Sequence, residues 1–138
     1  MNHEFLYGSE RLSILKVIQL AKGEIRGILS EDVLNKIRRS QQNVSDIVSD
    51  NKTVYGINTG FGVLANTHIS PEDTKILQHK ILQSHSVGVG NPISAFLSKI
   101  MLITKVHSLA KGYSGIQVET LDQRKQAAGS HDALADEG

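Results

Sequence analysis

The chain has 138 residues, which is enough for one domain that buries a core of its own. Its 15 basic and 14 acidic residues leave a formal net charge of +1, so the charge does not favour nucleic acid as a partner. The absence of cysteine excludes disulfides, thiolate metal sites and thiol nucleophiles. The sequence starts without a signal-peptide pattern, and its longest apolar stretch, residues 100–103, is too short to span a bilayer. We therefore expect a cytoplasmic protein without a membrane partner.

The first half of the chain predicts two helices and one or two short strands. Ser13 is a suitable N-cap for a helix that ends at Gly23, because apolar residues recur between them at helical spacing. Residues 25–29 alternate loosely and predict a strand. Ser30 then predicts the N-cap of a second helix, with acidic residues in its first turn. Residues 53–55 are briefly β-like, so they are the expected strand partner of residues 25–29.

The second half predicts three further helices. Ser70 and Pro71 combine an N-cap with proline at the first helical position, and this third helix breaks in a glycine-rich stretch, residues 88–92. Residues 93–111 predict a fourth helix, which is so apolar that we expect burial on several sides. A fifth helix begins within residues 114–121. The fold class is therefore mainly α, with four or five helices and a short strand pair.

The composition changes after Asp122. Residues 123–138 contain one large apolar side chain, Leu134, and a packed helix normally needs more. We therefore expect the organised segment to be residues 1–122 and residues 123–138 to form a disordered tail.

A glycine-rich loop, residues 55–62 with the sequence YGINTGFG, is the most informative part of the chain. Three glycines surround one ionisable side chain, the phenol of Tyr55, and glycine lets the backbone approach a ligand closely. A phosphate-binding loop would end in Gly-Lys-Ser or open directly into a helix, and this loop does neither. A plain turn with a packed, hydrogen-bonded tyrosine is the structural alternative to a reactive site. As a base, Tyr55 would need nearby positive charge or aligned N–H dipoles, because an unperturbed phenol has a pKa near ~10.

A second unusual segment, residues 83–90 with the sequence QSHSVGVG, follows about twenty residues later. His85 stands at the expected C-terminal end of the third helix, where it either contacts the last carbonyls or binds a substrate. None of the six histidines forms a His-x-x-x-His pair or lies in a carboxylate-rich cluster, so we expect no metal site.

Together these segments resemble the N-terminal part of the aromatic amino acid ammonia-lyases, and the histidine-specific members in particular. The resemblance runs from about residue 12 to residue 122. It is carried by AKG at residues 21–23, VYGINTGFG at 54–62, LQSHSVGVG at 82–90 and LAKGYSG at 109–115. The tyrosine motif at residues 54–62 is long and specific.

The resemblance implies a reaction. In this family an electrophilic methylidene-imidazolone group engages the amino acid, a tyrosine base removes a β-proton, and ammonia leaves to give an α,β-unsaturated acid. Tyr55 matches the base, while Ser84 and His85 match the positions that select the substrate ring. An imidazole ring exchanges hydrogen bonds with His85, whereas a phenyl ring would leave that polar partner unpaired. The implied reaction is thus L-histidine to urocanate, with the loop around Tyr55 supported by Gly56, Asn58, Thr59, Gly60 and Gly62.

The family forms its prosthetic group from an internal Ala-Ser-Gly, which the 138 residues do not contain; residues 128–130 read Ala-Gly-Ser. The resemblance therefore implies an N-terminal fragment of a homotetrameric histidine ammonia-lyase, inactive on its own. One alternative is a non-catalytic helical module that binds a lyase subunit or another partner. A further alternative, which Ser84 and His85 disfavour, is a lyase or aminomutase for another aromatic amino acid.

Overall fold

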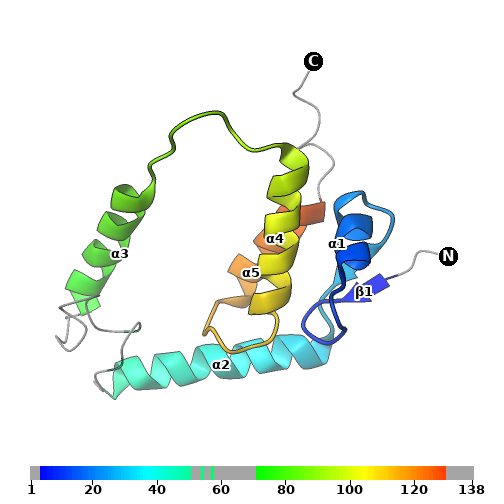
Figure 1. The fold of residues 1–138 in the computed structure, drawn as a ribbon. Coiled ribbons are helices and arrows are strands. Elements are labelled where there is room, and N and C mark those ends of the chain that lie inside the picture. The colour runs from blue at the N-terminus through cyan, green and yellow to red at the C-terminus, as the bar shows by residue number, and fades with distance from the viewer. Residues whose placement is uncertain (1–3, 51–53, 55–56, 58–70, 130–138) are drawn as a thin grey trace. The chain divides into compact units, whose positions relative to one another are not determined.

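The computed structural model describes residues 4–50, 54, 57 and 71–129. These residues form five helices and a two-stranded sheet, which confirms the predicted mainly α class. In chain order the elements are β1 (Glu4–Leu6), α1 (Ile14–Ala21), β2 (Arg26–Ile28), α2 (Glu31–Ser49), α3 (Pro71–His85), α4 (Ala95–Leu109) and α5 (Val118–Gly129) (Figure 1). Within this described part of the chain, no helix has the length and apolarity that crossing a membrane requires.

The helices begin where the sequence places capping serines. Ser13, Ser30 and Ser94 each accept a hydrogen bond at Oγ from the backbone N–H three residues later, at 3.3, 3.4 and 3.3 Å respectively. These side chains satisfy N–H groups that have no partner inside the helix. The predicted starts of α1 and α2 are therefore confirmed, and α4 begins two residues later than residue 93 because Ser94 caps it.

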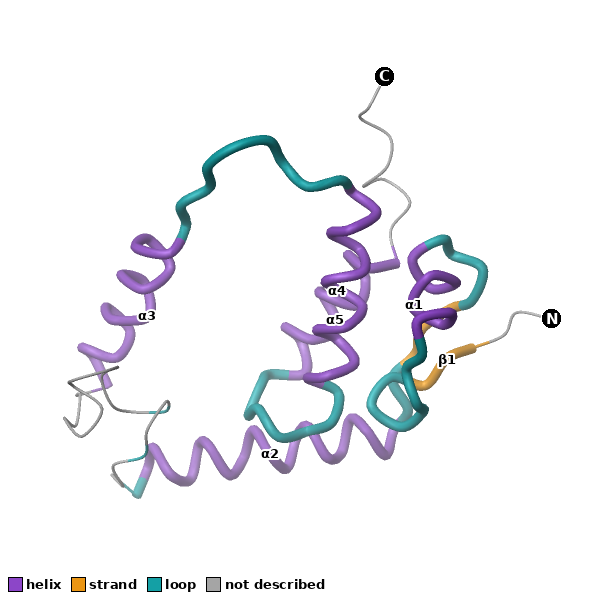
Figure 2. Tube along the Cα trace, in the orientation of Figure 1, coloured by secondary structure: helices purple, strands orange, loops and turns teal. Residues whose placement is uncertain are grey.

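The strand pair joins β1 and β2 in parallel, with Phe5 opposite Gly27 (Figure 2). The strand expected in residues 25–29 is confirmed as β2, and it pairs with β1. Residues 53 and 55 themselves lie outside the described residues, and Val54 is not in a strand. A three-residue strand is too short to show alternation in the sequence. It is held instead by burial of Phe5, which is fully buried, and by a hydrogen bond that the Tyr7 N–H donates to the Ile28 carbonyl at 2.9 Å.

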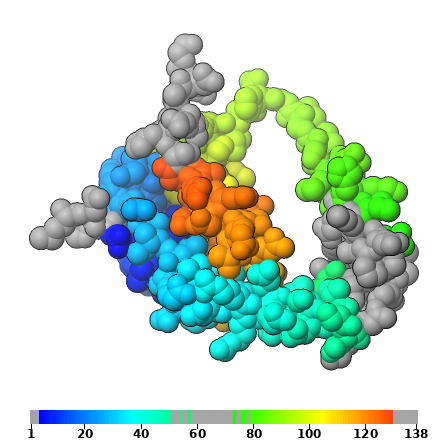
Figure 3. Space-filling model, turned by 180° about the vertical axis from the view of Figure 1, so that it is seen from behind, coloured from blue at the N-terminus to red at the C-terminus, as the bar shows by residue number. Residues whose placement is uncertain are grey.

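The chain divides into two compact units, which we call the core unit (residues 1–42 and 92–138) and the motif unit (residues 43–91). The buried side chains of the described residues all belong to the core unit. In it, α5 packs against α4, α1 and β2. Figure 3 shows α5 in orange beside the blue N-terminal segment. The largest fully buried side chains are those of Phe5, Val33, Ile37, Ile103, Val106 and Leu121.

The expectation of disorder after Asp122 is wrong for residues 123–129, which form the second half of α5. Ala128 is buried, and the Lys125 ammonium lies 2.6 Å from the Asp122 carboxylate. Residues 123–129 contain no large apolar side chain. A helix of good helix formers can instead be anchored through Leu121 and a small alanine. Residues 130–138 lie outside the described residues.

The expected burial of α4 on several sides is also corrected. Ile103 and Val106 are fully buried, whereas Leu97 and Met101 are 51% and 61% exposed. One face of α4 therefore packs into the core unit, and apolar side chains elsewhere on the helix reach the surface of this chain.

Candidate functional site

The expected catalytic loop lies almost entirely outside the described residues. This applies to Tyr55 and to the supporting residues Gly56, Asn58, Thr59, Gly60 and Gly62, whose roles remain predictions. Two neighbours are described. The Ile57 N–H donates to the Val54 carbonyl at 3.1 Å, and both residues are half-buried.

Ser84 and His85 lie together at the C-terminal end of α3, as the sequence predicts. The Ser84 hydroxyl donates to the Ile81 carbonyl at 3.0 Å, and its Oγ lies 3.0 Å from His85 Nδ1. His85 Nδ1 in turn lies 2.9 Å from the same carbonyl. A carbonyl only accepts hydrogen bonds, so this contact requires the proton on Nδ1. In the neutral ring, His85 then presents Nε2 as an acceptor.

The two interpretations of His85 are therefore compatible. Its ring satisfies a carbonyl in the last turn of α3, and the same hydrogen bond fixes the tautomer that leaves Nε2 for a ligand. Both Ser84 and His85 are exposed. An enclosed pocket for a substrate ring would thus need walls from residues beyond those that the structure describes.

The segment after α3 is irregular, as its glycines predict. The described residues 86–94 contain neither helix nor strand, and Val87 and Val89 are 75% and 96% exposed. The Ser86 N–H donates to the Leu82 carbonyl at 2.9 Å, which closes the last turn of α3 just beyond His85. Ser84 and His85 are consequently presented at a helix end followed by exposed chain.

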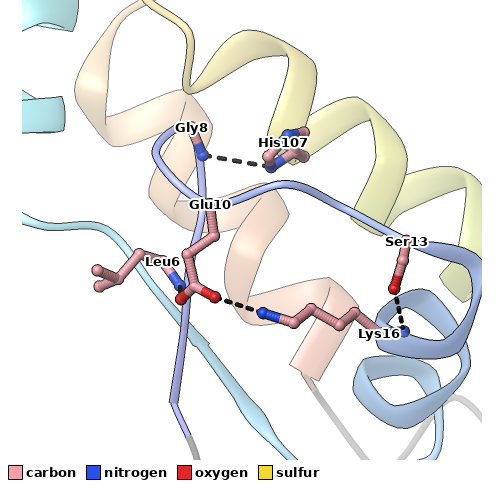
Figure 4. A network of polar contacts seen from close by, with 6 residues as sticks. All are labelled: Leu6, Gly8, Glu10, Ser13, Lys16 and His107. Atoms are coloured by element: carbon pink, nitrogen blue, oxygen red, sulfur yellow. Dashed lines mark hydrogen bonds and ion pairs between the residues drawn. The ribbon is translucent and has the colours of Figure 1, made fainter.

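A polar network in the core unit was not predicted from the sequence (Figure 4). The Gly8 N–H donates to His107 Nδ1 at 3.3 Å, although these residues are 99 positions apart. Burial, and secondarily the charge of Lys111, lowers the pKa of His107. The neutral ring is thus favoured, and only the neutral ring offers Nδ1 as an acceptor. His107 therefore joins α4 to the turn after β1.

A second part of this network involves Glu10. Its carboxylate accepts a hydrogen bond from the Leu6 N–H at 2.8 Å and forms an ion pair with Lys16, as the dashed lines in Figure 4 show. The hydrogen bond from Lys16 and then that from Leu6 lower the pKa of Glu10. The Lys16 ammonium also lies 5.0 Å from the centroid of the Phe5 ring. These contacts tie α1 to β1, so we assign them a structural role.

No cluster of three potential metal ligands occurs among the described histidine, aspartate and glutamate side chains. The family's prosthetic group does not fit the chain by itself, because its Ala-Ser-Gly precursor is absent from the 138 residues.

The chain matches a known protein family and several known proteins. A family model described as aromatic amino acid lyase matches residues 12–130. Histidine ammonia-lyase from Vibrio cholerae is 40% identical over 111 residues, which cover 80% of this chain and 22% of that protein. Histidine ammonia-lyase from Pseudoalteromonas atlantica is 36% identical over 122 residues, covering 88% and 24%. The chain thus spans about a quarter of the length of the curated relatives it matches.

Solved structures agree. Histidine ammonia-lyase from Trypanosoma cruzi matches with a TM-score of 0.79 at 32% identity, over 91% of this chain and 25% of that one. An ergothioneine-degrading enzyme from Treponema denticola covers 91% of this chain and 25% of its own, with a TM-score of 0.82 at 21% identity. Tyrosine aminomutase from Streptomyces globisporus gives 0.82 at 22%, over 92% and 24% of the two chains. The last two matches show the fold alone.

Proposed function

Because the chain belongs to the aromatic amino acid lyase family, we propose that it forms the N-terminal part of a histidine ammonia-lyase. The reaction would convert L-histidine to urocanate and ammonia. The observation that carries the substrate assignment is the Ser84–His85 pair at the end of α3, in a chain whose curated relatives include histidine ammonia-lyases at 36–40% identity.

In this proposal Tyr55 is the base. The β-proton of an amino acid is barely acidic, so its removal needs both an electrophile on the substrate and a base held in place. The methylidene-imidazolone group supplies the electrophile in this family. Tyr55 takes the proton at its phenolate oxygen, and the amides of Gly56 and Gly60 are candidates to stabilise that charge. The 138 residues alone should therefore produce no urocanate.

His85 selects the ring. With its proton on Nδ1, it offers Nε2 to the N–H of an imidazole substrate, and Ser84 holds the histidine ring from the neighbouring position. A phenyl ring has no such donor and would leave Nε2 unpaired, which disfavours phenylalanine. A lyase or aminomutase specific for phenylalanine is disfavoured for the same reason.

A chimeric enzyme tests this assignment. Residues 12–122 would replace the matching segment of the Vibrio cholerae enzyme, and urocanate formation would be followed by its ultraviolet absorbance. We expect activity on histidine, and we expect His85→Leu to lower kcat/KM for histidine by roughly ten- to a hundredfold through loss of one hydrogen bond. His79→Leu, at an exposed position of the same helix, is the matched control. An unchanged kcat/KM in His85→Leu would refute the role of His85.

A second candidate is a non-catalytic helical module that binds a lyase subunit. Exposed apolar side chains favour it, among them Ile76 and Leu82 on α3, at 54% and 67% exposure. Light scattering on the purified chain, alone and mixed with a full-length lyase, distinguishes the cases. A monodisperse monomer that does not join the lyase would exclude this second function.

A further inference from the structure

A cavity of about 500 Å³ opens in the core unit. Its walls come from the end of α1, from β2, from α4 and from the C-terminal half of α5. Among the described residues they include five polar side chains, those of Tyr7, Arg26, Lys99, Lys125 and Gln126, and the apolar side chains of Leu20 and Ile25. The Ser84–His85 pair is not among the described residues that line it.

Two of the polar wall residues are buried without a side-chain partner. Lys99 is 4% exposed and Tyr7 is 2% exposed. In the described part of the chain, no carboxylate forms an ion pair with Lys99, and no group is hydrogen-bonded to the Tyr7 hydroxyl. The described side chains also contain no fully inaccessible nitrogen or oxygen atom that lacks a partner. The Lys99 ammonium and the Tyr7 hydroxyl therefore reach accessible space, and both residues line the cavity.

The charge of the wall is positive. Arg26, Lys99 and Lys125 line the cavity, and no aspartate or glutamate does among the described lining residues. The Asp122 carboxylate balances Lys125 at 2.6 Å, but Arg26 and Lys99 have no such partner among the described residues. Burial raises the pKa of Tyr7 to about 12, so its hydroxyl keeps its proton and is available as a donor. The wall thus presents donors and positive charge together.

The position of Tyr7 is set by Gly27 in β2. A Cβ at position 27 would collide with the Tyr7 ring, so only glycine lets the ring lie against this strand. The aromatic ring of Tyr7 packs edge-on against Phe5, with ring centroids 5.4 Å apart. The hydroxyl therefore stands at a defined place in the cavity wall.

We propose that this cavity binds a small organic anion. Its carboxylate or phosphate would be held by Lys99 and Tyr7, with Arg26 at the rim, and its apolar part would contact Leu20 and Ile25. The volume suits a small molecule. An anion would supply the buried Lys99 with the countercharge that burial of an ammonium requires.

The test uses the full 138-residue chain and three probes: inorganic phosphate, phenyl phosphate and benzoate. Binding is measured by isothermal titration calorimetry at constant ionic strength in chloride, so that general salt effects cancel. We expect saturable binding of phenyl phosphate or benzoate, or both, which shows whether phosphate or carboxylate is preferred. Equal affinity for inorganic phosphate and phenyl phosphate, with no binding of benzoate, would refute the apolar part of the proposal.

Variants locate the site. Lys99→Met should weaken binding roughly ten- to a hundredfold, as expected for one lost charge-assisted hydrogen bond, whereas Lys105→Met at an exposed position of α4 should not change it. If Lys99→Met loses the helical circular dichroism of the parent, Tyr7→Phe decides, because it removes only a hydroxyl and should weaken binding several-fold. The absence of saturable binding of all three probes would overturn the proposal. Unchanged binding in folded Lys99→Met or in Tyr7→Phe would overturn it as well.

Discussion

The core unit and the motif unit carry different properties of this protein. All buried side chains of the described residues lie in the core unit, where α1, α4, α5 and the strand pair pack together. The motif unit contains the tyrosine loop and the Ser84–His85 pair, and the described side chains of α3 are exposed or half-buried. The residues expected to stabilise this chain and those expected to perform its chemistry therefore belong to different units.

Shortening a fully buried side chain of the core unit should have the largest effect on stability. Ile37 is fully buried, so Ile37→Ala should lower the free energy of unfolding by about 2–5 kcal/mol. Ile76→Ala in the motif unit removes a side chain that is 54% exposed and should change it by less than about 0.5 kcal/mol. The urea midpoint of the 138-residue chain measures both. Equal losses of unfolding free energy in the two variants would contradict the proposed difference between the units.

One glycine in each unit allows the two units to be compared by the space around the backbone. Gly8 has a φ of +80°, and a Cβ there would collide with the Ala110 carbonyl. Gly8→Ala should therefore destabilise the chain by about 1–3 kcal/mol. At Gly88 in the motif unit a Cβ meets nothing within 4 Å, so Gly88→Ala is the matched control and should be close to neutral. A neutral Gly8→Ala would contradict the tight approach of the first turn to α4.

His107 predicts a dependence of stability on pH. Its pKa is lowered in the folded state, so the unfolded chain binds more protons as the pH falls through the unfolded value of about 6.5. The contribution of neutral His107 is complete above that value and is lost as the pH falls from it toward the lower folded pKa. The urea midpoint should therefore decrease between about pH 7.5 and about pH 5.5, and His107→Gln should reduce the decrease.

His79→Gln, at an exposed position of α3, is the control for this experiment and should keep the decrease. An identical pH dependence in His107→Gln and in the parent chain would show that another group is responsible.

The smallest expected effect concerns Glu10. Its pKa is lowered by the hydrogen bonds from Lys16 and Leu6, so its contribution is present at neutral pH and is lost as the pH falls below the ordinary value of 4.5. Glu10 is partly exposed, and solvent screens the pair. Glu10→Gln should therefore cost less than about 1 kcal/mol at neutral pH, with the difference from the parent vanishing in acid. A constant difference between the two unfolding curves from neutral to acidic pH would show that the charge of Glu10 is not involved.

Local signals predicted the helices well because their caps are encoded within a few residues. Ser13 and Ser30 each accept the backbone hydrogen bond expected of an N-cap. The candidate site is predicted from two sequence motifs, at residues 54–62 and 82–90. Both can be recognised without knowledge of the fold. The position of His85 at the end of α3 also followed from the sequence.

The remaining features depend on contacts between distant residues. Strand β1 has three residues and is defined by its pairing with β2, which no local pattern reports. The end of α5 is anchored by the small side chain of Ala128, and counting large apolar residues overlooks it. The contact between Gly8 and His107 joins residues 99 positions apart. Lys99 lies within the apolar helix expected from residues 93–111, and its place in a cavity wall depends on α1, β2 and α5, which contribute the other walls.

The most direct test of the central proposal is the kcat of Tyr55→Phe in the chimera that carries residues 12–122 of this chain in the Vibrio cholerae enzyme. Phenylalanine keeps the ring and removes the group that takes the β-proton. We predict a loss of about 10²–10⁴-fold in kcat for histidine, with the chimera's fold and assembly unchanged. Near-normal turnover of the Tyr55→Phe chimera would contradict the assignment of Tyr55 as the base.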